Sequence, residues 1–145
     1  KRYDGCFYEE SAVLDYIGTT DIQYYDLEWA EEWQRGVGST SDVNNFNANP
    51  QFKEHVKKVL VNVTTLDKLI DKYDVKHIDY LKLDIEGMEW AILQDYTWKI
   101  KPKKIKCEYV HWENHGIVLG DYVKMLEHMG YTITMLEEDF IAVHD

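Results

Sequence analysis

Cysteines, long apolar runs and basic residues are all scarce in this 145-residue chain. Its two cysteines, Cys6 and Cys107, form neither a disulfide framework nor a CxxC metal motif, so we expect a reducing, cytoplasmic compartment. The longest uninterrupted aliphatic or aromatic runs span four residues, as at 90–93 and 140–143, which is far short of a membrane span. The sequence therefore predicts a soluble protein.

Basic side chains are outnumbered, since 16 Lys and Arg stand against 27 Asp and Glu, for a formal net charge of −11. An acidic chain lacks the broad positive surface that neutralises phosphates, which argues against general binding to nucleic acid or to an anionic membrane. The sequence also lacks GxGxxG, P-loop and GxSxG motifs, so no nucleotide or hydrolase signature identifies its function. We expect neither nucleic acid nor membrane among its partners.

Large side chains are plentiful, because 45% of the residues are apolar and 14% are aromatic, enough for one core in a single domain over residues 1–145. Residues 36–50 differ, being rich in Gly, Ser, Asn and Asp, which favour turns. A long surface loop is predicted there. It is either a substrate-contacting segment, with Ser39, Thr40 and Ser41 as candidate contacts, or a mobile insertion.

Hydrophobic periodicity and turn residues predict the regular elements. Strands are expected at 12–17, 22–26, 59–63, 78–85, 104–110, 131–136 and 140–144. Helices are expected at 28–35, after a cap at Thr64 or Thr65, at 88–93, and from a cap at Asp121 to a stop at Gly130. The first two strands should form a hairpin with a turn at 18–20, and the last two should form another.

Strands and helices alternate from Val59 to Gly130, which predicts an α/β fold with a parallel sheet covered by helices and an antiparallel strand at its end. Such sheets bind ligands at the carboxyl ends of their strands. The chemistry is therefore expected in the loops that follow the strands at 78–85 and 104–110.

Two acids leave the first of these strands. Asp84 and Glu86 are two positions apart, so in an extended strand both point to one face, and Gly87 allows a close approach of ligand or backbone. A carboxylate here can take a proton from a hydroxyl, hold a substrate or ligate a divalent cation. The alternative is that one of them caps the following helix.

The second strand ends in another polar group, made of Glu108, His111, Glu113 and His115. Histidine and carboxylate together suit a general base or a metal site, but the spacing matches no strong metal motif, so contact of one histidine with substrate is the favoured interpretation. The five tryptophans can stack on a sugar or a flat ligand, although most are expected in the core.

Several of these segments carry a family pattern: Thr65-Leu66-Asp67, Lys82 to Gly87, Glu89 to Leu93, and Glu108 on the next strand. Over Val61 to Glu113 the chain resembles the C-terminal half of the FkbM family of S-adenosylmethionine-dependent methyltransferases. The resemblance implies a Rossmann-like class I methyltransferase sheet, mostly parallel with a C-terminal antiparallel hairpin, and methyl transfer to a hydroxyl oxygen of a small molecule or sugar.

The same resemblance implies roles for individual residues. Asp84, Glu86 and His111 are the expected catalytic residues. Asp84, Ile85 and Gly87 are expected to contact S-adenosylmethionine, while Glu108 and Trp112 join the loop residues Ser39, Thr40 and Ser41 in contacting the acceptor, and no metal ligand is expected.

The chain departs from the family pattern upstream, where the glycine-rich cofactor loop and the ribose-binding acid are absent. We therefore expect an N-terminally incomplete methyltransferase domain. The strand at 78–85 would then lie at an exposed sheet edge, which predicts a homo-oligomer. Two alternatives stay open: a catalytically inactive binding or interaction domain, and a metal-dependent enzyme that uses Asp84, Glu86 and His111.

Overall fold

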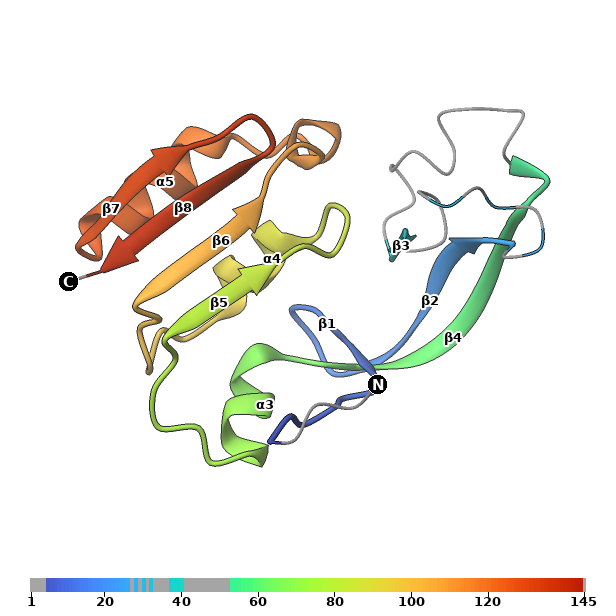
Figure 1. Cartoon of the computed structure of the whole chain (residues 1–145), viewed down its shortest axis with the longest axis horizontal. Helices are drawn as coiled ribbons and strands as arrows, with labels where there is room; N and C mark the ends of the chain where they lie inside the picture. Colours follow the sequence, from blue (N-terminus) through green and yellow to red (C-terminus); the bar gives the residue numbers. More distant parts are fainter. Residues whose placement is uncertain are drawn as a thin grey trace.

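The computed structural model describes residues 5–26, 28, 30, 32, 37–40 and 53–144. Within these ranges the chain forms eight strands and three α-helices, arranged as two four-stranded sheets (Figure 1). Most of the helix predicted over 28–35 lies outside the described residues, as do Trp29, Trp33 and Ser41.

The first sheet has the strand order β1-β4-β2-β3, with bounds Ser11–Val13, Val56–Thr64, Gly18–Tyr25 and Gly38–Ser39. Strand β1 runs parallel to β4, and β2 runs antiparallel to β4 along its whole length, from Gly18 opposite Val63 to Tyr25 opposite Val56. The predicted hairpin is therefore wrong. Both segments pair with β4 rather than with each other, and residues 18–20, expected as the turn, belong to β2.

The second sheet has the order β5-β6-β8-β7, with bounds Tyr80–Leu83, Lys104–Glu108, Asp139–His144 and Tyr131–Met135. The predicted C-terminal hairpin is confirmed as β7 and β8. Strand β5 pairs with β6 alone in the described part of the chain, and it is shorter than the strand predicted at 78–85.

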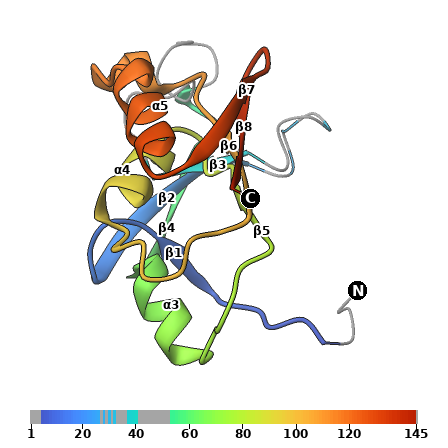
Figure 2. The same cartoon turned by 90° about the vertical axis from the view of Figure 1, so that its left-hand side faces the viewer.

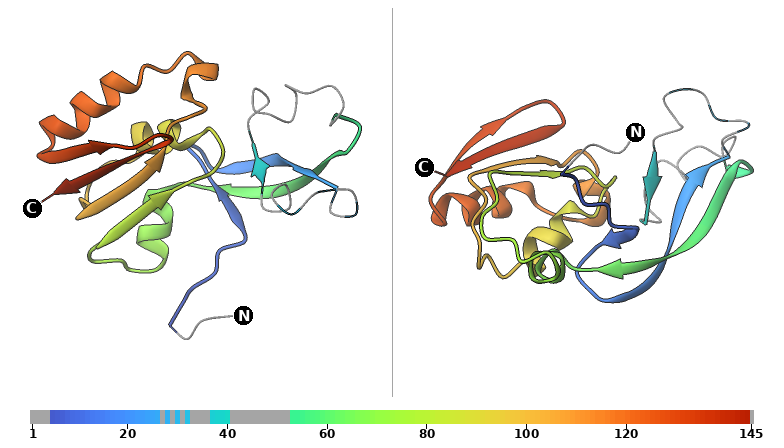
Figure 3. Two further views of the ribbon diagram at one scale, coloured as in Figure 1. Left: turned by 45° about the horizontal axis from the view of Figure 1, so that its top comes forward. Right: turned by 60° about the horizontal axis from the view of Figure 1, so that its bottom comes forward.

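The α/β class is confirmed, but a mostly parallel sheet is not what the structure contains. Two of the six strand pairings are parallel, β1 with β4 and β5 with β6. The other four are antiparallel, because β4 folds back along β2 and because the chain ends in a hairpin. Figure 3 shows the two sheets as separate arrays, joined along the chain by helix α3 (Leu66–Lys72).

Local capping signals were predicted with mixed success. Thr65 caps α3, its Oγ1 accepting a hydrogen bond from the Lys68 amide at 3.3 Å. Helix α5 (Leu119–His128) begins without a side-chain cap, so the prediction of Asp121 at that position is wrong, and Asp121 lies in the first turn. The stop at Gly130 is confirmed: this glycine adopts a left-handed φ of 95° just after the helix.

The core lies between the second sheet and helices α4 (Glu89–Asp95) and α5, which cover the same face of that sheet (Figure 2). Alternate side chains of β6 and β8 point into it and are fully buried: Ile105, Cys107, Phe140 and Ala142. Each large apolar side chain buried this way contributes about 1.5–3 kcal/mol. No helix in the described ranges is long and apolar enough to cross a membrane.

Candidate active site

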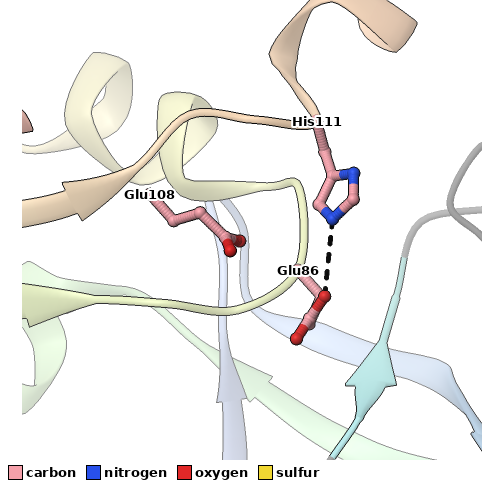
Figure 4. A group of neighbouring side chains, drawn as sticks. All are labelled: Glu86, Glu108 and His111. Atoms are coloured by element: carbon pink, nitrogen blue, oxygen red, sulfur yellow. Dashed lines mark ion pairs between the residues drawn. The ribbon is translucent and has the colours of Figure 1, made fainter. Parts of the chain in front are cut away.

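The parallel pair β5 and β6 positions the candidate site. The carboxyl ends of parallel strands meet at one edge of a sheet, so the loops that leave β5 and β6 are neighbours. Figure 4 shows Glu86 of the first loop beside Glu108 at the end of β6 and His111 of the second loop. One potential ligand atom from each of these three side chains lies within 4.8 Å of the other two. Two of the three expected catalytic residues, Glu86 and His111, therefore lie together, and the third member of the cluster is Glu108 rather than Asp84.

Glu86 reaches this position by a route that its sequence spacing did not predict. Strand β5 ends at Leu83, and Glu86 has a left-handed φ of 61°, followed by Gly87 at 114°. Asp84 and Glu86 therefore do not share a strand face, and Asp84 pairs instead with Lys82 at 2.5 Å. A left-handed φ costs a non-glycine residue roughly 1 kcal/mol, so the surrounding structure must hold Glu86 in place.

The side chain of Glu89 supplies much of that support. It is fully buried, and its Oε1 accepts hydrogen bonds from the amides of Ile85 at 2.7 Å and Gly87 at 3.2 Å. Its Oε2 accepts from the Trp112 indole at 3.3 Å, which ties the loop after β5 to the loop after β6. From the first sheet, the Ser39 hydroxyl donates to the Glu86 carbonyl at 2.8 Å.

Sequence reasoning missed Glu89, which it treated only as part of a helix start. The available signal was its place on the apolar face of α4, where Ile92 and Leu93 follow at three and four positions. An acid in that pattern is buried, and a buried acid needs donors. The helix itself begins after Met88 without a side-chain cap, so the alternative in which Asp84 or Glu86 caps it is wrong.

The electrostatics of the cluster are unusual. Burial first, and then the neighbouring carboxylates of Glu86, Glu89 and Asp84, raise the pKa of Glu108 to about 8. Its Oε2 is buried and has no hydrogen-bond partner within the described ranges. Burial also raises the pKa of Glu86, although the nearby His111 opposes this effect. At neutral pH the site therefore holds one carboxyl that favours its protonated form.

His111 and Glu86 form the accessible pair of the cluster. His111 Nε2 lies 3.5 Å from Glu86 Oε2, and the two side chains are 13% and 26% exposed. Burial is deep enough to strengthen their interaction, while the remaining exposure leaves room for a ligand to reach both. An imidazole backed by a carboxylate is a competent proton acceptor at neutral pH.

Other predicted residues are placed apart from this cluster. Trp112 is 1% exposed and packs edge-on against Phe140, so it is mainly a core residue, although it also borders the cavity lined by the segment 109–120. Glu113 is exposed, and His115 packs against the Trp90 ring, where burial lowers its pKa. The four-residue group predicted after β6 thus contributes only Glu108 and His111.

A cavity of about 240 Å³ lies where the loop after β5 faces the first sheet. Asp84, Ile85 and Thr40 line it together with residues 11–14. The cavity therefore brings together Asp84 and Ile85, which were expected to contact the cofactor, and Thr40, which was expected to contact the substrate. Gly87, the third expected cofactor contact, is buried, and its amide is used by Glu89. A larger cavity of about 640 Å³ is lined by residues of the segment 109–120, on either side of His111 in sequence.

Comparison with known proteins identifies one family. The model of the methyltransferase FkbM domain matches residues 16–133, a range that contains Glu86, Glu89, Glu108 and His111. The corresponding comparisons with curated proteins and with solved structures find no match.

Proposed function

This chain belongs to the FkbM methyltransferase family, and from that premise we propose that it transfers a methyl group to a hydroxyl oxygen of a small molecule or sugar. Family membership implies S-adenosylmethionine as the methyl donor. We further propose that β5, β6, β8 and β7 are the C-terminal part of a Rossmann-like methyltransferase sheet. The parallel β5–β6 pair and the antiparallel hairpin beside it support this.

When bound, S-adenosylmethionine supplies an electrophilic methyl group on a sulfonium. The residues that would hold part of it are Asp84, Ile85 and Thr40, which surround the cavity between the two sheets. At about 240 Å³ this cavity is smaller than the roughly 300–1,000 Å³ of typical ligand pockets. The described residues therefore fit a portion of the cofactor.

The Glu86–His111 pair is the observation that carries the proposal. His111 Nε2 faces the Glu86 carboxylate at 3.5 Å, which favours the tautomer that carries its proton on Nε2 and lets Nδ1 take the proton of the acceptor hydroxyl. With that proton removed, the hydroxyl oxygen would be the nucleophile for the methyl group that the bound cofactor would supply, and the cofactor would be left as a neutral thioether. The Glu86 carboxylate stabilises the imidazolium that results, and no covalent enzyme intermediate is needed.

Two measurements test this function. Calorimetry with S-adenosylhomocysteine reports cofactor binding, and transfer of labelled methyl to a panel of sugars, phenols and hydroxy acids reports activity. In His111→Asn we expect cofactor affinity to be unchanged and turnover to fall about 100-fold or more, because the proton acceptor is lost.

Glu113→Gln is the matched control, since Glu113 is exposed in the same loop and outside the cluster. It should keep full activity. Cofactor binding without turnover on any hydroxyl compound would favour the inactive binding domain, and equal activity of wild type and His111→Asn would remove His111 from the mechanism.

A further inference from the structure

We propose that Glu86, Glu108 and His111 form a binding site for a divalent first-row transition-metal ion, with Mn²⁺ and Zn²⁺ as the best candidates. Each residue offers one ligand atom, and the three atoms lie within 4.8 Å of one another. They come from the loop after β5, the end of β6 and the loop after β6, so the fold brings together residues that no sequence motif links. Cation binding is independent of methyl transfer, whereas its catalytic role rests on the proposed function.

The distances suit a shared ion. Ligand atoms about 2.0–2.2 Å from one metal lie roughly 3.0–4.4 Å apart, depending on the angle between them. The 3.5 Å between His111 Nε2 and Glu86 Oε2 falls inside this range, while it exceeds the usual 2.7–2.9 Å of a charge-assisted hydrogen bond. Glu108 completes the set after a small side-chain movement, because its carboxylate already points toward Glu86 (Figure 4).

The charge around the cluster favours a cation. Glu86 and Glu108 lie near the buried carboxylate of Glu89. The lysines of the two strands that lead to the cluster pair with other acids, Lys82 of β5 with Asp84 and Lys106 of β6 with Asp139. Among the described residues, the buried Oε2 of Glu108 has no hydrogen-bond partner, which is an observation independent of the cluster's geometry that fits a ligand at this oxygen. A divalent ion would satisfy this oxygen and offset the repulsion among the carboxylates.

The donor set selects the ion. An imidazole nitrogen beside two carboxylates suits Mn²⁺ or Zn²⁺ better than Ca²⁺ or Mg²⁺, which prefer oxygen ligands alone. Three protein ligands leave coordination positions open for water or for an acceptor oxygen. A hydroxyl bound there loses its proton more readily, so the ion would take over the activating role from the His111 base.

The test measures Mn²⁺ binding to the full chain after treatment with a chelator. Binding is monitored by electron paramagnetic resonance, which reports free Mn²⁺, and by calorimetry. Mn²⁺ is the primary probe because the exposed thiol of Cys6 can bind Zn²⁺. We expect one site in the wild type and at least about tenfold weaker binding in Glu108→Gln and in His111→Gln. Glu108→Gln keeps the size of the side chain, and circular dichroism verifies that each variant is folded.

Glu113→Gln and His115→Gln are the controls, since both residues lie in the short 3-10 helix Trp112–His115 that directly follows His111, outside the cluster. They should bind Mn²⁺ as the wild type does. Absence of Mn²⁺ binding, or equal weakening in the controls and the cluster variants, would overturn the proposal. Because no methyl donor is present, this result is separate from the cofactor and turnover measurements, and either proposal can fail alone.

Discussion

The two ends of helix α4 both depend on carboxylates, but in opposite ways. Thr97 and Lys99 follow the C-terminal end of α4, and both contact Asp67 of helix α3. Asp67 accepts hydrogen bonds from the amide and hydroxyl of Thr97 at 2.9 and 2.7 Å and lies 3.4 Å from Lys99 Nζ. Burial alone would raise the pKa of Asp67, yet these contacts outweigh burial and lower it. At the N-terminal end, the pKa values of Glu86 and Glu108 are raised.

The direction of the pKa shift separates carboxylates whose charge stabilises the folded state from carboxylates whose charge destabilises it. Asp67 gains favourable interactions when ionised, so its charge contributes to stability. Ionised Glu108 gains none from its four strongest charged neighbours, because all are carboxylates. A group kept at a cost to stability is typical of a functional site.

Glu89 should give the largest effect at the N-terminal end. Glu89→Ala leaves the amides of Ile85 and Gly87 and the Trp112 indole without their buried acceptor, so we expect a loss of about 3 kcal/mol in the free energy of unfolding. Urea unfolding at pH 7 measures it. Glu89→Gln retains one acceptor oxygen and should lose less. A loss below about 1 kcal/mol in Glu89→Ala would show that the loop does not need this anchor.

Asp67→Asn tests the C-terminal end, where we expect a smaller loss of about 1–2 kcal/mol at neutral pH. The pKa of Asp67 is lowered in the folded state, so its stabilising effect is present above the ordinary value of 3.8 and is lost as pH falls through the folded value. The difference from wild type should therefore vanish in acid. Asp74→Asn is the control, since Asp74 is 81% exposed and should change little.

Glu108→Gln should raise the free energy of unfolding at high pH, whereas Asp67→Asn should lower it at neutral pH. Glu108 has a folded pKa of about 8, above the ordinary 4.5, so its favourable contribution is complete below pH 4.5 and is lost as pH rises through about 8. In chelator, the variant should match wild type near pH 4.5 and be more stable by about 1 kcal/mol at pH 8, allowing for solvent screening. If Glu108→Gln destabilises the protein as Asp67→Asn does, the contrast between the two ends fails.

The smallest expected effect concerns association. Strand β5, which leads into the N-terminal end of α4, pairs only with β6 among the described residues. No described strand pairs with its other edge, and Tyr80 on this strand is 51% exposed. Light scattering over a range of concentrations should show a dimer. A monomer at every concentration would show that the open edge of β5 does not mediate association.

Features set by neighbouring residues could be predicted from the sequence. The Thr65 cap, the strand β6 and the β7–β8 hairpin depend on patterns and contacts within a few positions. The proximity of Glu108 and His111 could be predicted because both residues lie at the end of the same strand. These predictions are confirmed for this physical reason.

Features set by distant contacts could not. The pairing of β2 with β4 joins segments separated by the long loop, so the local turn signal at Gly18 was misleading. Glu86 was chosen correctly as a member of the cluster, but on strand geometry that ends before it. Its left-handed conformation depends on Ser39, 47 positions away, and on Glu89. No period or spacing in the sequence contains that information.

The burial of Cys107 has a practical consequence. Burial first, and then nearby carboxylates, raise its thiol pKa well above the ordinary value, whereas Cys6 is exposed. Only the thiolate reacts with maleimides, so the two cysteines differ in reactivity. A single fluorophore or spin label can be attached at Cys6 of the native sequence without mutagenesis, and loss of that selectivity would report opening of the core around β6.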